Sequence, residues 1–199
     1  MKQDMKTFEE IAADFRAAGV AVGDGAVTNA QNIWDSMPKE VQEDNVDDKP
    51  SFLFYGLYGV SGDSGTFRIL SENLFAFDWE VEDPYCMFAD FLACVNKIND
   101  GAFVLTDIKQ EVPDFSSIEE LESYPKKVTF GLNGTRYEYE AATEYDWFDG
   151  EIIEWFNDVL SQQGFSGRLY CFSSDMCCIF YGSEEWAKQF AQKTGMTLK

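Results

Sequence analysis

Hydrophobic residues recur at helical spacing near the start of the chain. Apolar positions three and four apart predict a helix that Thr7 caps and Gly19 stops, and a second helix that ends before Pro38. The segment 40–49 that follows is acidic and polar, which is typical of a solvated connection. Residues 1–49 are therefore expected to hold an N-terminal pair of helices.

The middle of the chain has the patterns of strands and of one further helix. Residues 51–58 are apolar on both alternating faces, which predicts a strand buried on both sides, with a short buried helix as the alternative. Strands are also predicted at 67–70, 74–80 and 102–108. Pro84 is expected to open a helix that closes near residues 99–101. Residues 114–123 indicate a polar connection or a short helix.

Two hairpins and two helices are predicted in the remainder. Asn133-Gly134 lies between alternating runs over 126–142, which predicts a type I′ turn, with Phe130 facing Tyr137 and Val128 facing Tyr139. A second hairpin over 168–181, apolar on both faces and therefore placed inside the sheet, is expected to turn near residues 174–175.

One helix should run from Asp149 to about Gln163, and another should begin after Ser183 and end before Gly195. The predicted fold is α+β: a mixed, mostly antiparallel sheet with helices packed against it, in a single domain over residues 1–199.

Charge and missing residue types exclude several classes of function. The 199 residues include 15 Lys and Arg against 36 Asp and Glu, a formal net charge of -21, and no histidine. A surface this negative repels phosphate backbones and anionic lipid, so we expect neither nucleic-acid nor membrane binding. Without histidine there is no Ser-His-Asp triad, no Cys-His pair and no His-Glu-x-x-His zinc site.

The sequence predicts a cytoplasmic protein without a metal or cofactor. The longest apolar run, 52–60, contains two glycines and is far shorter than the ~20 residues that cross a bilayer. The start of the sequence lacks an apolar signal core, which favours a cytoplasmic protein. No metal or cofactor motif is found. The five cysteines have no regular spacing and are expected to be reduced and buried. A tight turn in the second hairpin would make Cys171 and Cys178 cross-strand neighbours, and a redox role for them is the alternative.

Two acidic stretches are the candidate sites. The first surrounds the helix after residue 149, and Trp147 and Phe148 are expected at its surface, where aromatic residues beside carboxylates are typical anchors for a protein partner or a sugar. Its acidic residues are Glu144, Asp146, Asp149, Glu151 and Glu154. The second comprises Asp78, Glu80, Glu82 and Asp83, between a predicted strand and a predicted helix, where active sites often lie. The simpler interpretation is that Glu82 and Asp83, before Pro84, supply favourable charge at a helix start. The dipeptide Asp-Trp occurs in both stretches, at 78–79 and 146–147, and could reflect a faint duplication or chance.

The C-terminal third carries a resemblance. The stretches 145–149 (Tyr-Asp-Trp-Phe-Asp), 168–171 (Arg-Leu-Tyr-Cys), 179–181 (Ile-Phe-Tyr) and 183–186 (Ser-Glu-Glu-Trp) resemble small acidic bacterial proteins of unknown function. Some of these are similar to immunity proteins of bacterial toxin systems. The resemblance assigns no functional residue.

Three hypotheses follow. The first is an acidic binding domain, an inhibitor or immunity protein of a basic enzyme such as a nuclease, because negative charge steers association with a basic cleft. Its expected contacts are Asp146, Trp147, Asp149, Glu151 and Glu154. The second is an enzyme that uses carboxylates or a divalent cation on a small molecule or sugar. The third is a scaffold domain whose acidity serves solubility.

Overall fold

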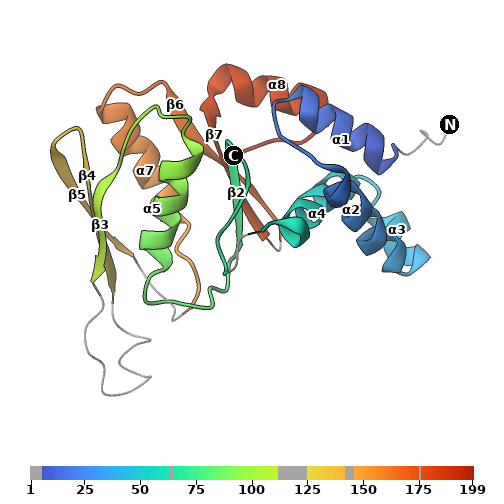
Figure 1. The fold of residues 1–199 in the computed structure, drawn as a ribbon, viewed down its shortest axis with the longest axis horizontal. Helices are drawn as coiled ribbons and strands as arrows, with labels where there is room; N and C mark the ends of the chain where they lie inside the picture. Colours follow the sequence, from blue (N-terminus) through green and yellow to red (C-terminus); the bar gives the residue numbers. More distant parts are fainter. Residues whose placement is uncertain (1–5, 63–64, 112–124, 142–145, 175) are drawn as a thin grey trace.

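The computed structural model describes residues 6–62, 65–111, 125–141, 146–174 and 176–199 (Figure 1). Its helices are α1 (Phe8–Ala17), α2 (Asp24–Ser36), α3 (Lys39–Asp44), α4 (Phe52–Val60), α5 (Met87–Ile98), α7 (Glu151–Gln162) and α8 (Glu184–Thr194), with a short 3-10 helix at Lys49–Ser51. Its strands are β1 (Arg68–Ser71), β2 (Leu74–Asp78), β3 (Thr106–Glu111), β4 (Lys126–Leu132), β5 (Thr135–Ala141), β6 (Gly167–Ser173) and β7 (Met176–Ser183). This is an α+β fold with helices at its N-terminal end, as predicted.

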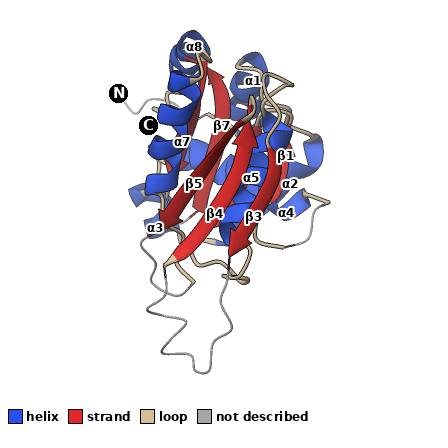
Figure 2. Ribbon diagram, turned by 90° about the vertical axis from the view of Figure 1, so that its left-hand side faces the viewer, coloured by secondary structure: helices blue, strands red, loops and turns tan. Residues whose placement is uncertain are grey.

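The described strands form two antiparallel sheets. A four-stranded sheet has the order β1-β2-β7-β6, and a three-stranded sheet has the order β3-β4-β5. Helices α5 and α7 lie between the sheets, and α1, α2, α4 and α8 cover the other face of the four-stranded sheet (Figure 1). Figure 2 shows the three-stranded sheet at the outer side of this stack, with α5 behind it. Within the described residues, no helix has the length and apolar character needed to span a membrane.

The four-stranded sheet is buried on both faces, because side chains of its central strands alternate between two cores. The core toward α5 and α7 receives Phe75, Phe77, Cys177 and Ile179. The core toward the N-terminal helices receives Leu74, Ala76, Cys178 and Phe180. The two cores therefore share β2 and β7. That the chain is one domain with a helical subregion at 1–49 stays a prediction.

Several predicted elements are confirmed in detail. Thr7 and Glu10 form a capping box at the start of α1, and Gly19 has a φ of 88° after its end. The Asn133-Gly134 hairpin has the predicted register, with Phe130 opposite Tyr137. The last helix begins after Ser183, whose hydroxyl accepts a hydrogen bond from the Trp186 N–H at 3.1 Å. The predicted connection at 114–123 lies outside the described residues.

The strand predicted at 51–58 is wrong and the alternative of a short buried helix is right, because residues 52–58 belong to helix α4. Its face with Leu53, Phe54 and Leu57 is buried in the N-terminal core, and Gly56 allows the closest approach to α2. A side chain on Gly56 would clash with the Ala26 carbonyl oxygen. A run that is apolar at every position satisfies the helical and the strand period equally, so periodicity alone did not separate them.

The strand predicted at 102–108 begins only at Thr106. The backbone before it is held by the end of α5 instead of by a neighbouring strand. The Leu105 N–H donates to Asn96 Oδ1 at 2.8 Å, and the Phe103 N–H donates to Asn99 Oδ1 at 3.5 Å. Phe103 and Leu105 are nevertheless buried, which explains why their pattern resembles a strand.

The second hairpin forms as predicted but with a different register and position. Phe172, not Cys171, lies opposite Cys178, and Cys171 lies opposite Ile179, so the predicted Cys171–Cys178 pairing is wrong by one residue. Strand β7 lies inside the sheet, whereas β6 lies at its edge. The outer side of β6 is covered locally: Cys171 exchanges two backbone hydrogen bonds with Lys199, of 2.7 and 2.9 Å.

Candidate functional site

The two acidic stretches of the sequence lie side by side in the structure. The Val81 N–H donates to the Asp146 carbonyl oxygen at 2.8 Å, and the Phe148 N–H donates to the Trp79 carbonyl oxygen at 2.9 Å. These bonds form an isolated antiparallel bridge with Glu80 opposite Trp147. Opposite residues in such a bridge project to the same side, so Glu80 and Trp147 are neighbours on the surface.

Phe148, the residue after Trp147 in the bridge, points into the core. Phe148 is only 5% exposed, and its ring centroid lies 4.7 Å from that of Phe77, 5.0 Å from Phe88 and 5.1 Å from Phe91. The expectation that Phe148 lies at the surface is therefore wrong. Side chains alternate along an extended segment, so anchoring Phe148 inward forces Trp147 outward. Trp147 is 54% exposed, as expected.

We define the acidic ridge as Glu80, Glu82, Asp146 and Trp147. Glu80, Glu82 and Asp146 line a shallow pocket of about 200 Å³ together with Val81 and Pro84. Among the described residues, no hydrogen bond or ion pair engages the carboxylates of Glu80, Glu82 or Asp146. The charges of Glu80 and Glu82, whose side chains are exposed, are therefore available to an outside partner.

A buried lysine lies behind the ridge. Lys126 at the start of β4 is almost fully buried, and burial lowers the pKa of its ammonium group, while the charge of Asp146 acts in the opposite direction. The charge of Asp146 thus interacts with that of a buried lysine, whereas the carboxylates of Glu80 and Glu82 remain exposed.

Asp149 has a structural role within the predicted site. Its Oδ2 accepts a hydrogen bond from the Tyr139 hydroxyl at 2.8 Å, and its Oδ1 accepts one from the Glu151 N–H at 3.0 Å. The second bond satisfies a free N–H group at the start of α7. Burial and the carboxylate of Asp149 raise the pKa of the Tyr139 hydroxyl, which keeps Tyr139 a donor to Asp149. Asp149 thus links α7 to β5.

The other two predicted contacts lie on the exposed face of α7. Glu154 forms an ion pair with Arg168 of β6, with an Nη2–Oε2 distance of 3.2 Å. Both side chains are exposed, so the pair adds little stability. Glu151 forms no side-chain ion pair or hydrogen bond with the described residues. Of the five contacts predicted from the sequence, Trp147 and Glu151 have side chains that the described residues do not engage, whereas Asp146 interacts electrostatically with Lys126. Glu144 lies outside the described residues.

The second acidic stretch completes the ridge, although the sequence favoured a helix-start role for it. Asp78 and Asp83 do serve their own backbone: they accept hydrogen bonds from the N–H groups of Glu80 and Tyr85, at 3.0 and 2.9 Å. Glu80 and Glu82 do not. The repeated Asp-Trp dipeptide was the one signal in the sequence that linked the two stretches, and it marks the segments that pair.

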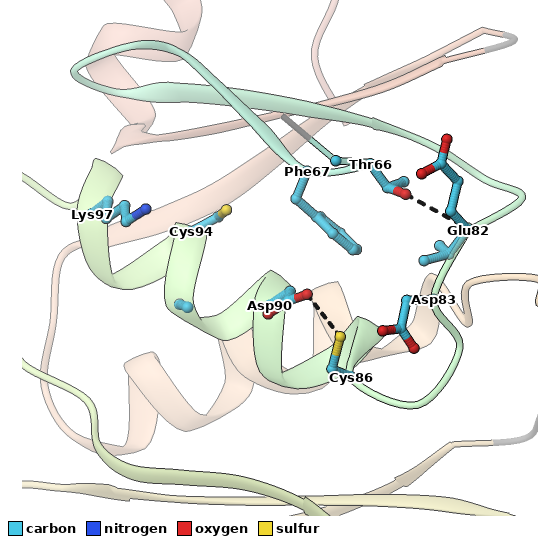
Figure 3. A pocket seen from close by; sticks show the side chains of 11 residues that line it. Thr66, Phe67, Glu82, Asp83, Cys86, Asp90, Cys94 and Lys97 are labelled. Atoms are coloured by element: carbon cyan, nitrogen blue, oxygen red, sulfur yellow. Dashed lines mark hydrogen bonds between the residues drawn. The ribbon is translucent and has the colours of Figure 1, made fainter. Parts of the chain in front are cut away.

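A larger pocket of about 300 Å³ lies beside the ridge and shares Glu82 with it (Figure 3). Cys86 lines this pocket, and its thiol donates to Asp90 Oδ2 at 3.0 Å. Burial and the neighbouring carboxylates raise the pKa of Cys86 to about 12. Since the thiolate is the nucleophile, Cys86 is an unreactive thiol near neutral pH.

Neither metal chemistry nor known relatives define the site. The described residues contain no cluster of three or more His, Cys, Asp or Glu arranged to hold a metal ion. No protein-family model matches the chain, and no curated protein or solved structure is significantly similar to it. The likeness to immunity proteins and the enzyme and scaffold alternatives therefore stay predictions.

Proposed function

We propose that this protein is an acidic binding domain that recognises a basic protein partner through the acidic ridge, acting as an inhibitor or immunity protein of a basic enzyme. The observation that carries the proposal is the bridge between residues 79–81 and 146–148, which gathers carboxylates from two distant segments around an exposed tryptophan. A cytoplasmic location, and no binding to nucleic acid or membranes, belong to the same proposal.

The ridge has the two components that strong protein interfaces combine. Trp147 offers a large apolar surface, and tryptophan is among the residues that contribute most to binding energy when a partner buries them. Glu80 lies opposite Trp147 in the bridge, and Glu82 and Asp146 line the pocket beside Glu80. Their charge would steer a basic partner and fix its orientation. In a nuclease-like partner these carboxylates would take the places of substrate phosphates.

The site is also preorganised. Trp147 is held by a backbone bridge on its own segment and by Phe148, whose ring is fixed among three phenylalanines of the core. Little conformational entropy is then lost when a partner binds, which favours affinity. Glu151, the first residue of α7 and exposed, adds a further negative charge next to this segment.

The test compares two variants that each remove three negative charges. The ridge variant carries Glu80→Gln, Glu82→Gln and Asp146→Asn. The control variant carries Glu40→Gln, Glu43→Gln and Asp44→Asn, all on α3, where the three side chains are exposed. Both have the same net charge, so any difference between them reports position.

The wild-type chain and both variants are used to capture proteins from a lysate of the source organism at low salt, followed by association kinetics with the recovered protein. We expect one basic protein in stoichiometric amount on wild type and control, and an association rate at least roughly tenfold lower for the ridge variant. Equal losses in both variants, or no stoichiometric partner, would contradict the proposal.

A further inference from the structure

A pair of cysteines lies on the face of the four-stranded sheet that packs toward α7. The sulfur atoms of Cys171 and Cys177 are 3.2 Å apart. Because Cys171 lies opposite Ile179 and Ser173 lies opposite Cys177, the two cysteines are diagonal neighbours on one face of the β6–β7 hairpin. Cys178 belongs to the core on the opposite face of the sheet.

The backbone around this pair is fixed. Cys171 lies between β7 on one side and the two backbone hydrogen bonds with Lys199 on the other. Cys177 lies in a central strand that pairs with both β2 and β6. The sulfur atoms need to approach from 3.2 Å to the ~2.0 Å of a disulfide bond, with neighbouring strands already in register.

The two thiols differ in accessibility and acidity. Cys171 is half-buried, whereas Cys177 is completely buried. The hydrogen bond from Cys177 and the positive charge of Lys199 lower the pKa of Cys171, while burial raises the pKa of Cys177 well above its ordinary value. An accessible, more acidic thiol next to a second thiol is the arrangement of a redox-active pair, in which one sulfur reacts with an oxidant and the other resolves the product.

We propose that Cys171 and Cys177 are a site of reversible oxidation, at which a peroxide-class oxidant converts the two thiols into an intramolecular disulfide. The thiolate of Cys171 attacks one oxygen of hydrogen peroxide, the O–O bond breaks, and the departing hydroxide takes up a proton to leave as water. Cys171 is then a sulfenic acid. Hydrogen peroxide is small enough to reach the half-buried sulfur of Cys171.

The second step closes the disulfide. The Cys177 sulfur attacks the Cys171 sulfur, the S–O bond breaks, and hydroxide leaves with the Cys177 thiol proton as a second water. The two thiols together lose two electrons, and one peroxide is reduced to two waters. A dithiol reductant reverses the reaction by thiol–disulfide exchange.

The experiment treats the full folded chain with hydrogen peroxide and reads the intact mass and the cross-linked peptides. Wild type should lose about 2 Da, the two thiol hydrogens, with one cross-link between Cys171 and Cys177 that a reductant removes. A chain that keeps both thiols, or a cross-link that joins other cysteines or two chains, would overturn the proposal. The wild-type chain alone is therefore enough to support or overturn the proposal.

Neighbouring cysteines supply a matched pair of variants. Cys177→Ala and Cys178→Ala remove adjacent, equally buried thiols that point to opposite faces of the sheet. Cys178→Ala should form the disulfide as wild type does. Cys177→Ala should instead accumulate a sulfenic acid at Cys171, detected with a sulfenic-acid-specific alkylating probe. Equal behaviour of the two variants would refute the assignment of Cys177 as the resolving thiol.

Discussion

Asn157 is the residue whose replacement should cost the most stability for the smallest change in volume. Its side-chain amide lies buried between α7 and the edge strand β6, where Nδ2 donates to the Leu169 carbonyl oxygen at 2.9 Å and Oδ1 accepts from the Leu169 N–H at 2.7 Å. Both groups of Leu169 point away from β7 and have no neighbouring strand there. The Asn157 side-chain amide therefore makes the two hydrogen bonds that the backbone of a neighbouring strand would otherwise make with Leu169.

The cost of Asn157→Ala follows from these two bonds. Each buried backbone group that loses its partner costs about 1–3 kcal/mol, so the pair predicts a loss of about 2–6 kcal/mol. That is a large part of the 5–15 kcal/mol that holds a typical domain together. Asn157→Leu restores the volume but not the hydrogen bonds, so it should lose nearly as much.

The assay is urea unfolding at equilibrium, with the free energy of unfolding extrapolated to water. Asn45→Ala is the control, because the Asn45 side-chain amide donates to the Val41 carbonyl oxygen at an exposed helix end, and its replacement should change stability by no more than about 0.5 kcal/mol. A loss below about 1 kcal/mol for Asn157→Ala would refute the reasoning. So would recovery of wild-type stability in Asn157→Leu, since packing alone would then explain the site.

Three further predictions concern helix ends and the ridge. Gln110→Ala should cost about 0.5–2 kcal/mol in urea unfolding, because Gln110 Oε1 accepts from two backbone N–H groups at the start of α5. Glu10→Gln should lower the free energy of urea unfolding at pH 7 and leave it nearly unchanged at pH 3: the hydrogen bonds from Thr7 lower the pKa of Glu10 in the folded chain, so wild type loses this stabilisation as pH falls through and below the ordinary value near 4.5, and the two proteins then converge. Trp147→Ala should speed dissociation of the recovered partner at least about tenfold with little change in association rate, as measured by surface plasmon resonance; an unchanged dissociation rate would remove Trp147 from the interface.

Local signals were the part of the fold that the sequence predicted well. The capping box of Thr7 and Glu10 and the turn at Asn133-Gly134 involve residues that are close in sequence, and each residue type has one strongly preferred backbone role there. The φ angles of 51° at Asn133 and 78° at Gly134 are those that a type I′ turn requires. Such elements are predictable because no distant residue has to be known.

The candidate site was predictable only in part, because it depends on contacts between distant segments. The pattern around Asp149 identified α7 and its exposed carboxylates, but the inward position of Phe148 depends on a pocket built by β2 and α5. Likewise, the sequence favoured a helix-start role for Glu82, whereas the structure groups Glu80 and Glu82 with Asp146 around one pocket. A single sequence states which residues are acidic, but not which of them meet.

The four-stranded sheet, buried on both faces, also changes what fixes the alignment of its strands. In a sheet with one wet face, a slip by one residue would expose the apolar side chains, and this cost enforces the register. In β7 a slip would only exchange Cys177 and Ile179 with Cys178 and Phe180 between two apolar cores. Alignment must then come from side-chain size on each face, from the turn after Ser173, and from edge contacts such as that of Asn157 with Leu169. Substitutions that give the two faces of β7 side chains of similar size should therefore favour hairpins with a shifted register, even when the total buried hydrophobic area stays the same.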